Sequence, residues 1–359
     1  MIAGQGAAPA ASFWSGRRVF LTGHTGFKGA WLAAWLRSLG ASVHGYALPP
    51  EPGPSLFRDL FPQPDAVGRF GDIRDAAATR AAMEAARPEI VLHLAAQALV
   101  RRSYADPLET FATNVMGTAH VLEAARAVAS VRAVVVVSSD KCYENREWVW
   151  PYREDEALGG HDPYSASKAC TEIAAAAWRR SFGAEGKLIA SARAGNVIGG
   201  GDWAADRLLP DCARAFAAGQ PVRLRNPHAT RPWQHVLEPL SGYLRLAEVL
   251  LGPEGARFAA AWNFGPVPED AEPVGLVARL AAEAWGPEAV VEIAPDGGPH
   301  EAGFLSVDAS RARALLGWRP RWRLAQAVAR TLRFYRAQHE GARPAALVAA
   351  DIAAYATPS

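Results

Sequence analysis

The sequence predicts an α/β fold, in which a doubly wound parallel sheet precedes a smaller C-terminal domain. Short apolar runs at residues 18–22, 90–94 and 133–138 have the composition of strands that are buried on both faces. Patterns of helical period separate these runs, and a glycine-rich turn follows the first of them. Because crossovers between parallel strands are right-handed, the loops after the strands gather along one edge, where ligands bind.

The elements follow one another at short intervals. The first strand leads through the glycine turn into a helix over residues 27–39, which ends at Gly40. Residues 41–47 are expected to form the second strand. The elements expected after that are a helix at 76–86, the strand at 90–94, a helix at 103–129, the strand at 133–138 and a helix at 163–182.

Beyond about residue 190 this alternation becomes irregular, and proline and glycine gather at residues 199–201, 221–232 and 265–273. We expect a smaller domain there that closes over the carboxyl edge of the sheet and binds the substrate. The expected division is a sheet domain at 13–190 that residues 231–262 rejoin, a substrate domain at 191–230 and 263–359, and a flexible tail at 1–12.

Composition restricts the class of protein. Among 359 residues, 38 basic and 36 acidic ones leave a net charge of +2, which argues against nucleic-acid binding through a basic face. The three cysteines, Cys142, Cys170 and Cys212, are too widely spaced for a disulfide framework or a metal cluster. No apolar run approaches the roughly 20 residues of a membrane-spanning helix, and the N-terminal segment lacks the pattern of a signal peptide. We therefore expect a cytoplasmic protein with no metal site and no membrane or nucleic-acid partner.

The turn at residues 23–29 has the pattern G-x-x-G-x-x-G between a strand and a helix. Glycine permits the sharp turn and lets a pyrophosphate approach the helix N-terminus, where unpaired N–H groups and the helix dipole favour an anion. At the first strand–helix junction of an α/β chain, this pattern is typical of a Rossmann-type dinucleotide-binding domain. The residues expected against the cofactor are Gly23, Thr25, Gly26, Phe27, Lys28 and Gly29.

The second strand leaves the choice between NAD and NADP open. An acidic residue about 20 positions after the turn usually holds the adenosine ribose, but this strand ends with HGYA at residues 44–47. Lys28 would suit the additional phosphate of NADP. Asp72 and Ile73, in a G-D-I-R-D segment, are expected at the adenine edge.

Catalytic chemistry is indicated by Tyr164 and Lys168, which stand four positions apart and so share one face of a helix. A tyrosine with its ordinary pKa near 10 is a poor base, and a nearby ammonium favours its phenolate. Ser139 ends the apolar run AVVVVS at the edge where chemistry is expected. Together the three residues predict a site for hydride transfer.

These motifs resemble the extended short-chain dehydrogenase/reductase family, and in detail its nucleotide-sugar 4,6-dehydratase branch. The resemblance spans most of residues 13–245, in the segments TGHTGFKGAWL (22–32), HLAAQALVRRSY (93–104), SSDKCYEN (138–145), DPYSASKACTE (162–172), RAGNVIGGGDWAADRLLPD (193–211) and RNPHATRPWQHVLEPLSGYL (225–244). The last two segments are specific to sugar-nucleotide enzymes. The resemblance implies NAD as cofactor, with Leu94, Ala95 and Ala96 beside it.

Asp140 and Lys141 directly follow Ser139. Related nucleotide-sugar dehydratases carry an Asp-Glu pair there as acid and base, and the CDP-glucose branch resembles this chain in having Asp-Lys. The resemblance implies that Tyr164 takes the proton of the sugar 4-hydroxyl while C4 is oxidised. Asp140 would donate a proton to the departing 6-hydroxyl, and Lys141 would remove the C5 proton directly or through a bound water. The product would be a 4-keto-6-deoxy sugar.

The substrate implied by this branch is CDP-D-glucose. A guanidinium grips phosphate oxygens in bidentate fashion, so Arg193 and Arg231 are expected at the pyrophosphate. The other residues expected at the substrate are Asn196 at the nucleotide-sugar, Gln97 and Ser103 at the sugar, Arg207, Leu208 and Arg223 at the base, and His300 near the ribose. The helices at 103–129 and 163–182 pair in relatives as a four-helix bundle, which implies a homodimer.

Two alternatives remain open. Another enzyme of the same fold, such as a UDP-sugar 4-epimerase or a GDP-mannose-type dehydratase, would share the glycine turn and the catalytic tyrosine. Epimerisation needs no acid and base for elimination, so Asp140 and Lys141 argue against an epimerase. A non-catalytic NAD-binding scaffold would typically lose Tyr164 or Lys168, and both are present.

Overall fold

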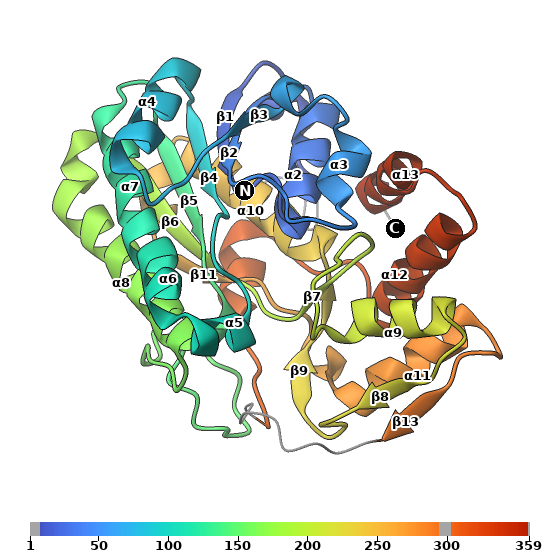
Figure 1. The fold of residues 1–359 in the computed structure, drawn as a ribbon. Coiled ribbons are helices and arrows are strands. Elements are labelled where there is room, and N and C mark those ends of the chain that lie inside the picture. Colours follow the sequence, from blue (N-terminus) through green and yellow to red (C-terminus); the bar gives the residue numbers. More distant parts are fainter. Residues whose placement is uncertain (1–7, 294–302, 358–359) are drawn as a thin grey trace.

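The computed structural model describes residues 8–293 and 303–357 (Figure 1). Its central layer is a sheet of seven strands in the order β11-β6-β5-β4-β1-β2-β3, and all neighbouring strands are parallel. From β1 in the interior, the chain extends the sheet first towards β3 and then towards β11. This is the doubly wound arrangement predicted from the sequence. The strands are β1 (Arg18–Thr22), β2 (Ser42–Ala47), β3 (Gly68–Phe70), β4 (Ile90–His93), β5 (Ala133–Val137), β6 (Leu188–Arg193) and β11 (Ala261–Asn263).

Helices cover both faces of the sheet, because successive strand side chains point to opposite faces. Val134 and Val136 of β5 pack in one apolar cluster with α4 (Ala76–Ala86), α7 (Gly117–Ala127) and α8 (Pro163–Phe182). Val135 and Val137 pack in a second cluster with α2 (Phe27–Ser38) and α10 (Leu237–Leu250). Figure 1 shows these two helix layers on either side of the strands. The sheet is therefore buried on both faces, as its continuous apolar runs predict.

The helix predicted at 103–129 is broken into shorter elements. The structure has α5 (Val100–Ala105), α6 (Pro107–Phe111), the π-helical turn η2 (Ala112–Met116) and α7. Pro107 has no N–H to continue α5, and the Asp106 side chain accepts a hydrogen bond from the Glu109 N–H at 2.9 Å, which starts a new helix. The helical spacing of apolar residues therefore continues across the boundary between α5 and α6 and does not reveal it.

Some elements are not among those predicted. β3 and β11 have three residues each, too few to show a period, and β6 (LIASAR) carries small residues with a weak apolar signal. Ser55 caps α3 by accepting from the Arg58 N–H at 3.4 Å. The short helices outside the prediction are α1 (Ala11–Trp14), α3 (Leu56–Leu60), η1 (Pro64–Ala66), η3 (Asp140–Cys142), η4 (Gly183–Glu185), η5 (Gly255–Phe258), η6 (Pro268–Asp270) and the π-helical η7 (Ala312–Leu316).

A second group of elements lies beside the carboxyl edge of the sheet (Figure 1). It contains three small two-stranded sheets, in which β7 pairs with β10 and β8 with β13 in parallel, and β9 pairs with β12 antiparallel. Their strands and the accompanying helices are β7 (Val197–Ile198), α9 (Leu208–Ala217), β8 (Val222–Leu224), β9 (Thr230–Pro232), β10 (Gln234–His235), β12 (Ala271–Pro273), α11 (Val274–Trp285), β13 (Val291–Ile293) and α12 (Leu324–His339). A separate apolar cluster joins α9, α11 and α12.

Later segments return to the sheet. Within residues 231–262, α10 packs under β5, and β11, which begins at Ala261, adds the last strand beside β6. The C-terminal helix α13 (Pro344–Ala356) contacts α2 and α3. No helix in the described part of the chain combines the length and the apolar character needed to cross a membrane.

Residues 8–12 belong to the segment predicted as a flexible tail, yet hydrogen bonds hold part of it. The Ala10 N–H and the Trp14 indole each donate to Oε1 of Glu248 at 2.9 Å. Trp14 is fully buried in the core beside α2. The described end of the tail is therefore anchored to the fold.

Candidate active site

The glycine turn is fixed between β1, β4 and α2. Gly23 has a φ of +77°, and a Cβ there would lie 2.7 Å from the Ala95 nitrogen. A Cβ on Gly29 would lie 2.0 Å from the Gly23 carbonyl oxygen. Only glycine fits at either position. The first N–H groups of α2, which follow its N-cap Gly26, face the carboxyl edge of the sheet. These donors lie where the motif predicts an anion cradle.

The end of β4 forms the adjoining wall. The Thr22 hydroxyl accepts hydrogen bonds from the Leu94 and Ala95 N–H groups at 3.1 and 3.2 Å and is bonded to Nδ1 of His93 at 2.7 Å. This arrangement holds Leu94 and Ala95, which the resemblance places beside the cofactor, next to the glycine turn. Thr25 is tied to the end of β2 through a hydrogen bond from its hydroxyl to the Leu48 carbonyl at 2.9 Å.

Ser139, Asp140 and Lys141 occupy the turn that follows β5, and the 3-10 turn η3 (Asp140–Cys142) gives them their conformation. The Ser139 hydroxyl donates to Oδ1 of Asp140 at 3.0 Å and accepts from the Lys141 N–H at 3.2 Å. Asp140 is 2% exposed and its Oδ2 has no hydrogen-bond partner among the described residues. Lys141 is half-buried. A buried carboxylate oxygen without a partner is available for a proton or for a substrate hydroxyl.

Tyr164 and Lys168 lie on the first turns of α8 and face this turn. Burial raises the pKa of Tyr164 to about 12, although a hydrogen bond with Ser139 acts in the opposite direction. Burial lowers the pKa of Lys168 to about 8, although the charge of Glu172 raises it. The ammonium donates to the Val137 carbonyl at 3.4 Å. The structure thus brings Ser139, Tyr164 and Lys168 together as predicted.

The Lys28 side chain, which starts from the glycine turn at the beginning of α2, lies close enough to Lys168 and Asp140 to interact with their charges. Burial and the charges of Lys168 and Arg207 lower the pKa of Lys28 to about 7, while Asp140 and Asp202 raise it. Arg207, which precedes α9, acts electrostatically on both Lys28 and Tyr164, and it forms an ion pair with Asp202 at 3.4 Å. Through Arg207, the second group of elements therefore contributes a positive charge close to the predicted catalytic residues. Leu208, next to it, is the first residue of α9.

Two residues predicted to contact the substrate make hydrogen bonds that join elements of the fold. The Ser103 hydroxyl accepts from the Tyr164 N–H at 3.1 Å and donates to the Val100 carbonyl, so it joins α5 to α8. Gln97 is bonded to Asn114 and Thr110 within the same layer.

The predicted arginines fall in different surroundings. Arg193 is 3% exposed and pairs with Glu172 at 2.9 Å, so its guanidinium points into the protein. Arg231 is buried on β9 and donates to the Thr230 carbonyl at 2.9 Å. Arg223 is exposed on β8 and lies 3.5 Å from Glu292.

The remaining predicted residues are distributed around the edge. Asn196 follows β6 with a left-handed φ of +38°, and its carbonyl accepts from the Gln234 N–H at 3.2 Å. Ile73 is buried in the cluster of α4 and α7. His300 lies outside the described residues.

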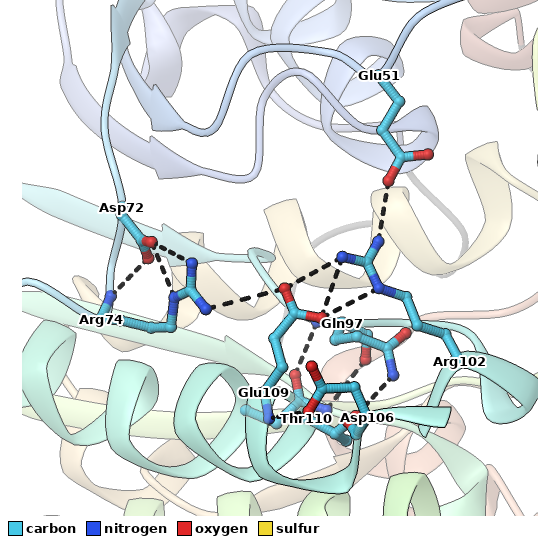
Figure 2. A network of polar contacts seen from close by, with 9 residues as sticks. Glu51, Asp72, Arg74, Gln97, Arg102, Asp106, Glu109 and Thr110 are labelled. Carbon is cyan, nitrogen blue, oxygen red and sulfur yellow. Dashed lines mark hydrogen bonds and ion pairs between the residues drawn. The ribbon is translucent and has the colours of Figure 1, made fainter. Parts of the chain in front are cut away.

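Asp72 belongs to a chain of partly exposed charges that crosses the loops after β2 and β3 (Figure 2). Its carboxylate pairs with Arg74 at 2.6 Å, and Arg74 lies 3.8 Å from Glu109 of α6. Arg102 of α5 pairs with Glu109 at 3.0 Å and with Glu51 of the loop after β2 at 2.9 Å. The chain of charges joins the loops that flank the adenosine end of a Rossmann-type site to α5 and α6. No motif predicts the whole chain of charges, because the pairs Arg74–Glu109 and Arg102–Glu51 that link its parts are far apart in sequence.

Three comparisons place these features among known proteins. Residues 19–258 match the family described as "NAD dependent epimerase/dehydratase family". The CDP-glucose 4,6-dehydratase of Salmonella typhimurium strain LT2 is 51% identical over 336 residues, which is 92% of this chain and 93% of that protein. The UDP-glucose 4-epimerase of Mycolicibacterium smegmatis is 30% identical over 256 residues, covering 70% of this chain and 77% of its own length.

The fold also matches a solved enzyme. The dTDP-glucose 4,6-dehydratase of Streptomyces venezuelae, solved with NAD bound, superposes with a TM-score of 0.75 and 25% identity over 91% of this chain and 99% of its own. The family match covers more than half of the chain, and the extensive identity to the Salmonella protein agrees with it. The chain therefore belongs to the NAD dependent epimerase/dehydratase family.

Proposed function

We propose that the chain is a nucleotide-sugar 4,6-dehydratase that converts CDP-D-glucose to CDP-4-dehydro-6-deoxy-D-glucose with NAD. The observation that carries this proposal is the turn of Ser139, Asp140 and Lys141, which faces Tyr164 and Lys168. It combines the residues for hydride transfer with a separate acid and base, in a chain 51% identical to a CDP-glucose 4,6-dehydratase. The 4-epimerase relative makes epimerisation the alternative reaction, which needs no such acid and base.

The residues around the edge fit a dinucleotide. The cradle at Gly23, Gly26 and Gly29 has no room for a Cβ at two of its positions and presents the N-terminus of α2 to a pyrophosphate. Leu94, Ala95 and Ala96 would form the wall beside it. NAD held there would supply the hydride chemistry, in which a hydride taken from C4 of the sugar is later returned to C6.

The first step requires a base at the sugar 4-hydroxyl. Tyr164 takes this proton as its phenolate, and the Ser139 hydroxyl donates a hydrogen bond to the developing ketone oxygen. Burial raises the pKa of Tyr164, so the phenolate needs a stabilising charge. The ammonium of Lys168 supplies it, because a nearby cation stabilises the phenolate. With a pKa of about 8, Lys168 is mostly protonated at pH 7.

Elimination of water follows once C4 carries a ketone, because the ketone acidifies the C5 proton. Lys141 removes this proton, directly or through a water, and returns it to C5 when the hydride reaches C6. Asp140, in its protonated form, donates to the departing 6-hydroxyl, and its unpartnered Oδ2 is the oxygen suited to this role. Gly195 lies against that carboxylate and leaves it room.

Substrate recognition is proposed for the second group of elements. Arg207 approaches the catalytic residues, Asn196 follows β6, Leu208 begins α9, and Arg231 lies within β9. We assign residues 13–190 with 231–262 to the cofactor domain, and 191–230 with 263–359 to the nucleotide-sugar domain. His300 and Arg223 complete the set predicted at the nucleotide.

We further propose a cytoplasmic homodimer. The exposed apolar side chains Leu108 and Phe111 of α6, Met116 of η2 and Ile173 of α8 lie on the helices that the sequence predicts at the interface. Exposed large apolar side chains on neighbouring elements mark interaction surfaces. The partner proposed for this face is a second copy of the chain, through a four-helix bundle.

The experiment that tests the function is incubation of the purified protein with CDP-, UDP-, GDP- and dTDP-glucose, with and without added NAD⁺. Product is followed by the near-ultraviolet absorbance that 4-keto-6-deoxy sugars develop in alkali. We expect a signal from CDP-glucose and much weaker signals from the others. Absence of the chromophore with every nucleotide, with NAD⁺ supplied, would overturn the proposal.

A further inference from the structure

A buried ion pair that the proposed chemistry does not use lies beneath the catalytic turn. Glu172 stands one helical turn beyond Lys168 on α8, and Arg193 is the last residue of β6. Their Oε2 and Nη2 atoms are 2.9 Å apart, and the two side chains are 2% and 4% exposed. Burial opposes the ionisation of Glu172, but the Arg193 charge and the hydrogen bonds of Ser138 and Ser191 keep its pKa below the ordinary value. The pair is therefore charged in the folded protein.

Each member of the pair holds one end of the catalytic turn. The Ser138 hydroxyl donates to Oε1 of Glu172. At the other end, Nη1 of Arg193 donates to the Tyr143 hydroxyl at 2.8 Å, and the guanidinium lies 4.9 Å from the centre of the Tyr143 ring. Ser138 and Tyr143 directly bracket residues 139–142 in the sequence. The ion pair thus closes a bridge across the segment that carries Ser139, Asp140 and Lys141.

The bridge is itself anchored on both sides. The Ser191 hydroxyl of β6 donates to Oε2 of Glu172 at 2.6 Å. The Tyr143 hydroxyl donates to Oδ1 of Asn263 on β11 at 2.7 Å, and the Asn263 amide nitrogen donates to the Tyr152 carbonyl at 2.9 Å. Arg193 also donates to the Glu154 carbonyl at 3.1 Å. Strands β6 and β11 therefore supply a rigid base for the turn.

A stabilising role alone does not account for such a pair. Removing two charges from water costs about as much as their attraction returns, so a buried ion pair is a weak means of stabilising a fold. Its hydrogen bonds fix orientation, however, and catalytic groups must be held within about 0.5 Å of the productive geometry. The charge of Glu172 also favours the ammonium form of Lys168.

We propose that Glu172 and Arg193 are positioning residues, which clamp the two ends of the catalytic turn, with the Glu172 carboxylate one helical turn beyond Lys168 on α8. The reaction positioned is the one proposed above, so this inference rests on that function. Neither side chain touches the substrate in this account. Both act through Ser138, Tyr143 and Lys168.

The test uses variants that remove one arm of the clamp each. Ser138→Ala and Tyr143→Phe delete single hydroxyls, and Glu172→Gln removes the charge in nearly the same shape. We expect kcat with CDP-glucose to fall by about 10-fold for the single hydroxyls and about 100-fold for Glu172→Gln, with KM changed less than 3-fold, since a small misplacement of catalytic groups costs rates of this order. If Glu172→Gln does not fold, the two hydroxyl variants still decide the question.

A matched control separates positioning from stability. Asp351 is another buried carboxylate, bonded to Arg330 at 2.7 Å between α12 and α13. Asp351→Asn makes the same chemical change away from the turn, so it is expected to lower the melting temperature and leave kcat within 2-fold. Equal losses of kcat in Asp351→Asn and Glu172→Gln would show that the effect is general destabilisation.

The pH profile tests the electrostatic part. The titratable groups acting on or beside Lys168 are Lys28 of α2, His93 of β4, Asp140 and Cys142 of η3, and Tyr164 and Glu172 of α8. Burial raises the pKa of the Cys142 thiol, which leaves Glu172 as the anion that holds the proton on Lys168. In Glu172→Gln the alkaline limb of kcat should therefore move to lower pH by about one unit.

A crystal structure of Glu172→Gln gives a readout that needs no substrate. We expect the backbone of residues 139–141 to move by more than about 0.5 Å relative to the unaltered protein. An unmoved turn together with unchanged kcat and pH profile would overturn the clamp. If the unaltered protein does not convert CDP-glucose, the proposed function fails, and the position of the turn still decides whether the clamp exists.

Discussion

Asp140 depends on a residue that carries no functional group. Gly195 lies so close that a Cβ there would be 1.8 Å from Oδ2 of Asp140. The backbone does not require glycine at this position through a positive φ, so the requirement comes from the space that the carboxylate occupies. The proposed acid of the elimination step thus owes its position to a glycine in the strand-end segment after β6.

Gly195→Ala is therefore expected to displace the Asp140 carboxylate and slow water elimination. We predict a loss of about 100-fold in kcat for dehydration, while C4 oxidation continues and reduced cofactor accumulates, which near-ultraviolet absorbance detects. Gly183→Ala is the matched control, because nothing lies within 4 Å of the added Cβ. Unchanged kcat in Gly195→Ala would contradict the role given to Asp140.

The charge on Lys168 predicts the pH dependence of the reaction. Its pKa is lowered to about 8, so the ammonium is present below that pH and is lost as the pH rises through it. Without the ammonium the Tyr164 phenolate loses its stabilising cation. We expect kcat to fall above about pH 8, and Lys168→Met to lose at least about 100-fold at every pH. A profile that stays level to about pH 9.5 would be inconsistent with this role.

At the scale of the elements, helix starts position the chemistry. Tyr164 is the second residue of α8, and the Asp162 side chain caps this helix by accepting from the Ser165 N–H at 2.9 Å. Asp75 caps α4, which packs on the same face of the sheet as α8, in the same way through the Ala78 N–H at 2.9 Å. The two caps are chemically alike, but one of them precedes the proposed base.

Asp162→Ala and Asp75→Ala should each destabilise the fold by about 1 kcal/mol, the usual value of such a cap. Denaturant unfolding measures this loss. Asp162→Ala alone should also lower kcat, by about 10-fold, because the first turn of α8 carries Tyr164. The same kcat in both variants would mean that the cap does not position the tyrosine.

The sequence predicts the elements with strong periods and misses those that depend on tertiary partners. The strands β1, β4 and β5 and the helices α4 and α8 are confirmed nearly to the residue. The helix predicted at 103–129 is wrong in its continuity, because a proline and a capping aspartate interrupt an unbroken apolar period. β11 has too few residues to show a strand pattern in the sequence, and it forms a strand through its pairing with β6.

The candidate site shows the same division. The glycine turn, the strand-end serine and the helical Tyr-Lys pair are local patterns, so the sequence indicates them. Arg193 is placed differently, since its buried partner Glu172 belongs to another element and no spacing between residues 172 and 193 reveals the contact. The one available signal was a glutamate one helical turn after Lys168 on the buried face of α8.

At the scale of the whole molecule, the proposed dimer accounts for the exposed apolar face on α6, η2 and α8. Ile173→Glu is expected to place a charge in that interface and to yield monomers in sedimentation experiments at micromolar concentration. Val290→Glu, a change at another exposed apolar residue, should leave association unaltered. A protein that sediments as a monomer without any substitution would contradict the dimer.

The central claim is that the residues at the carboxyl edge of this sheet catalyse oxidation at C4, elimination of water and reduction at C6 of the same sugar. It is tested most directly with CDP-glucose that carries deuterium at C4, in the presence of NAD⁺, with the product analysed by NMR. A dehydratase moves the label within the molecule, so the account predicts deuterium at C6 of a 4-keto-6-deoxy sugar. Deuterium that remains at C4 of an intact hexose, with or without inversion there, would contradict it.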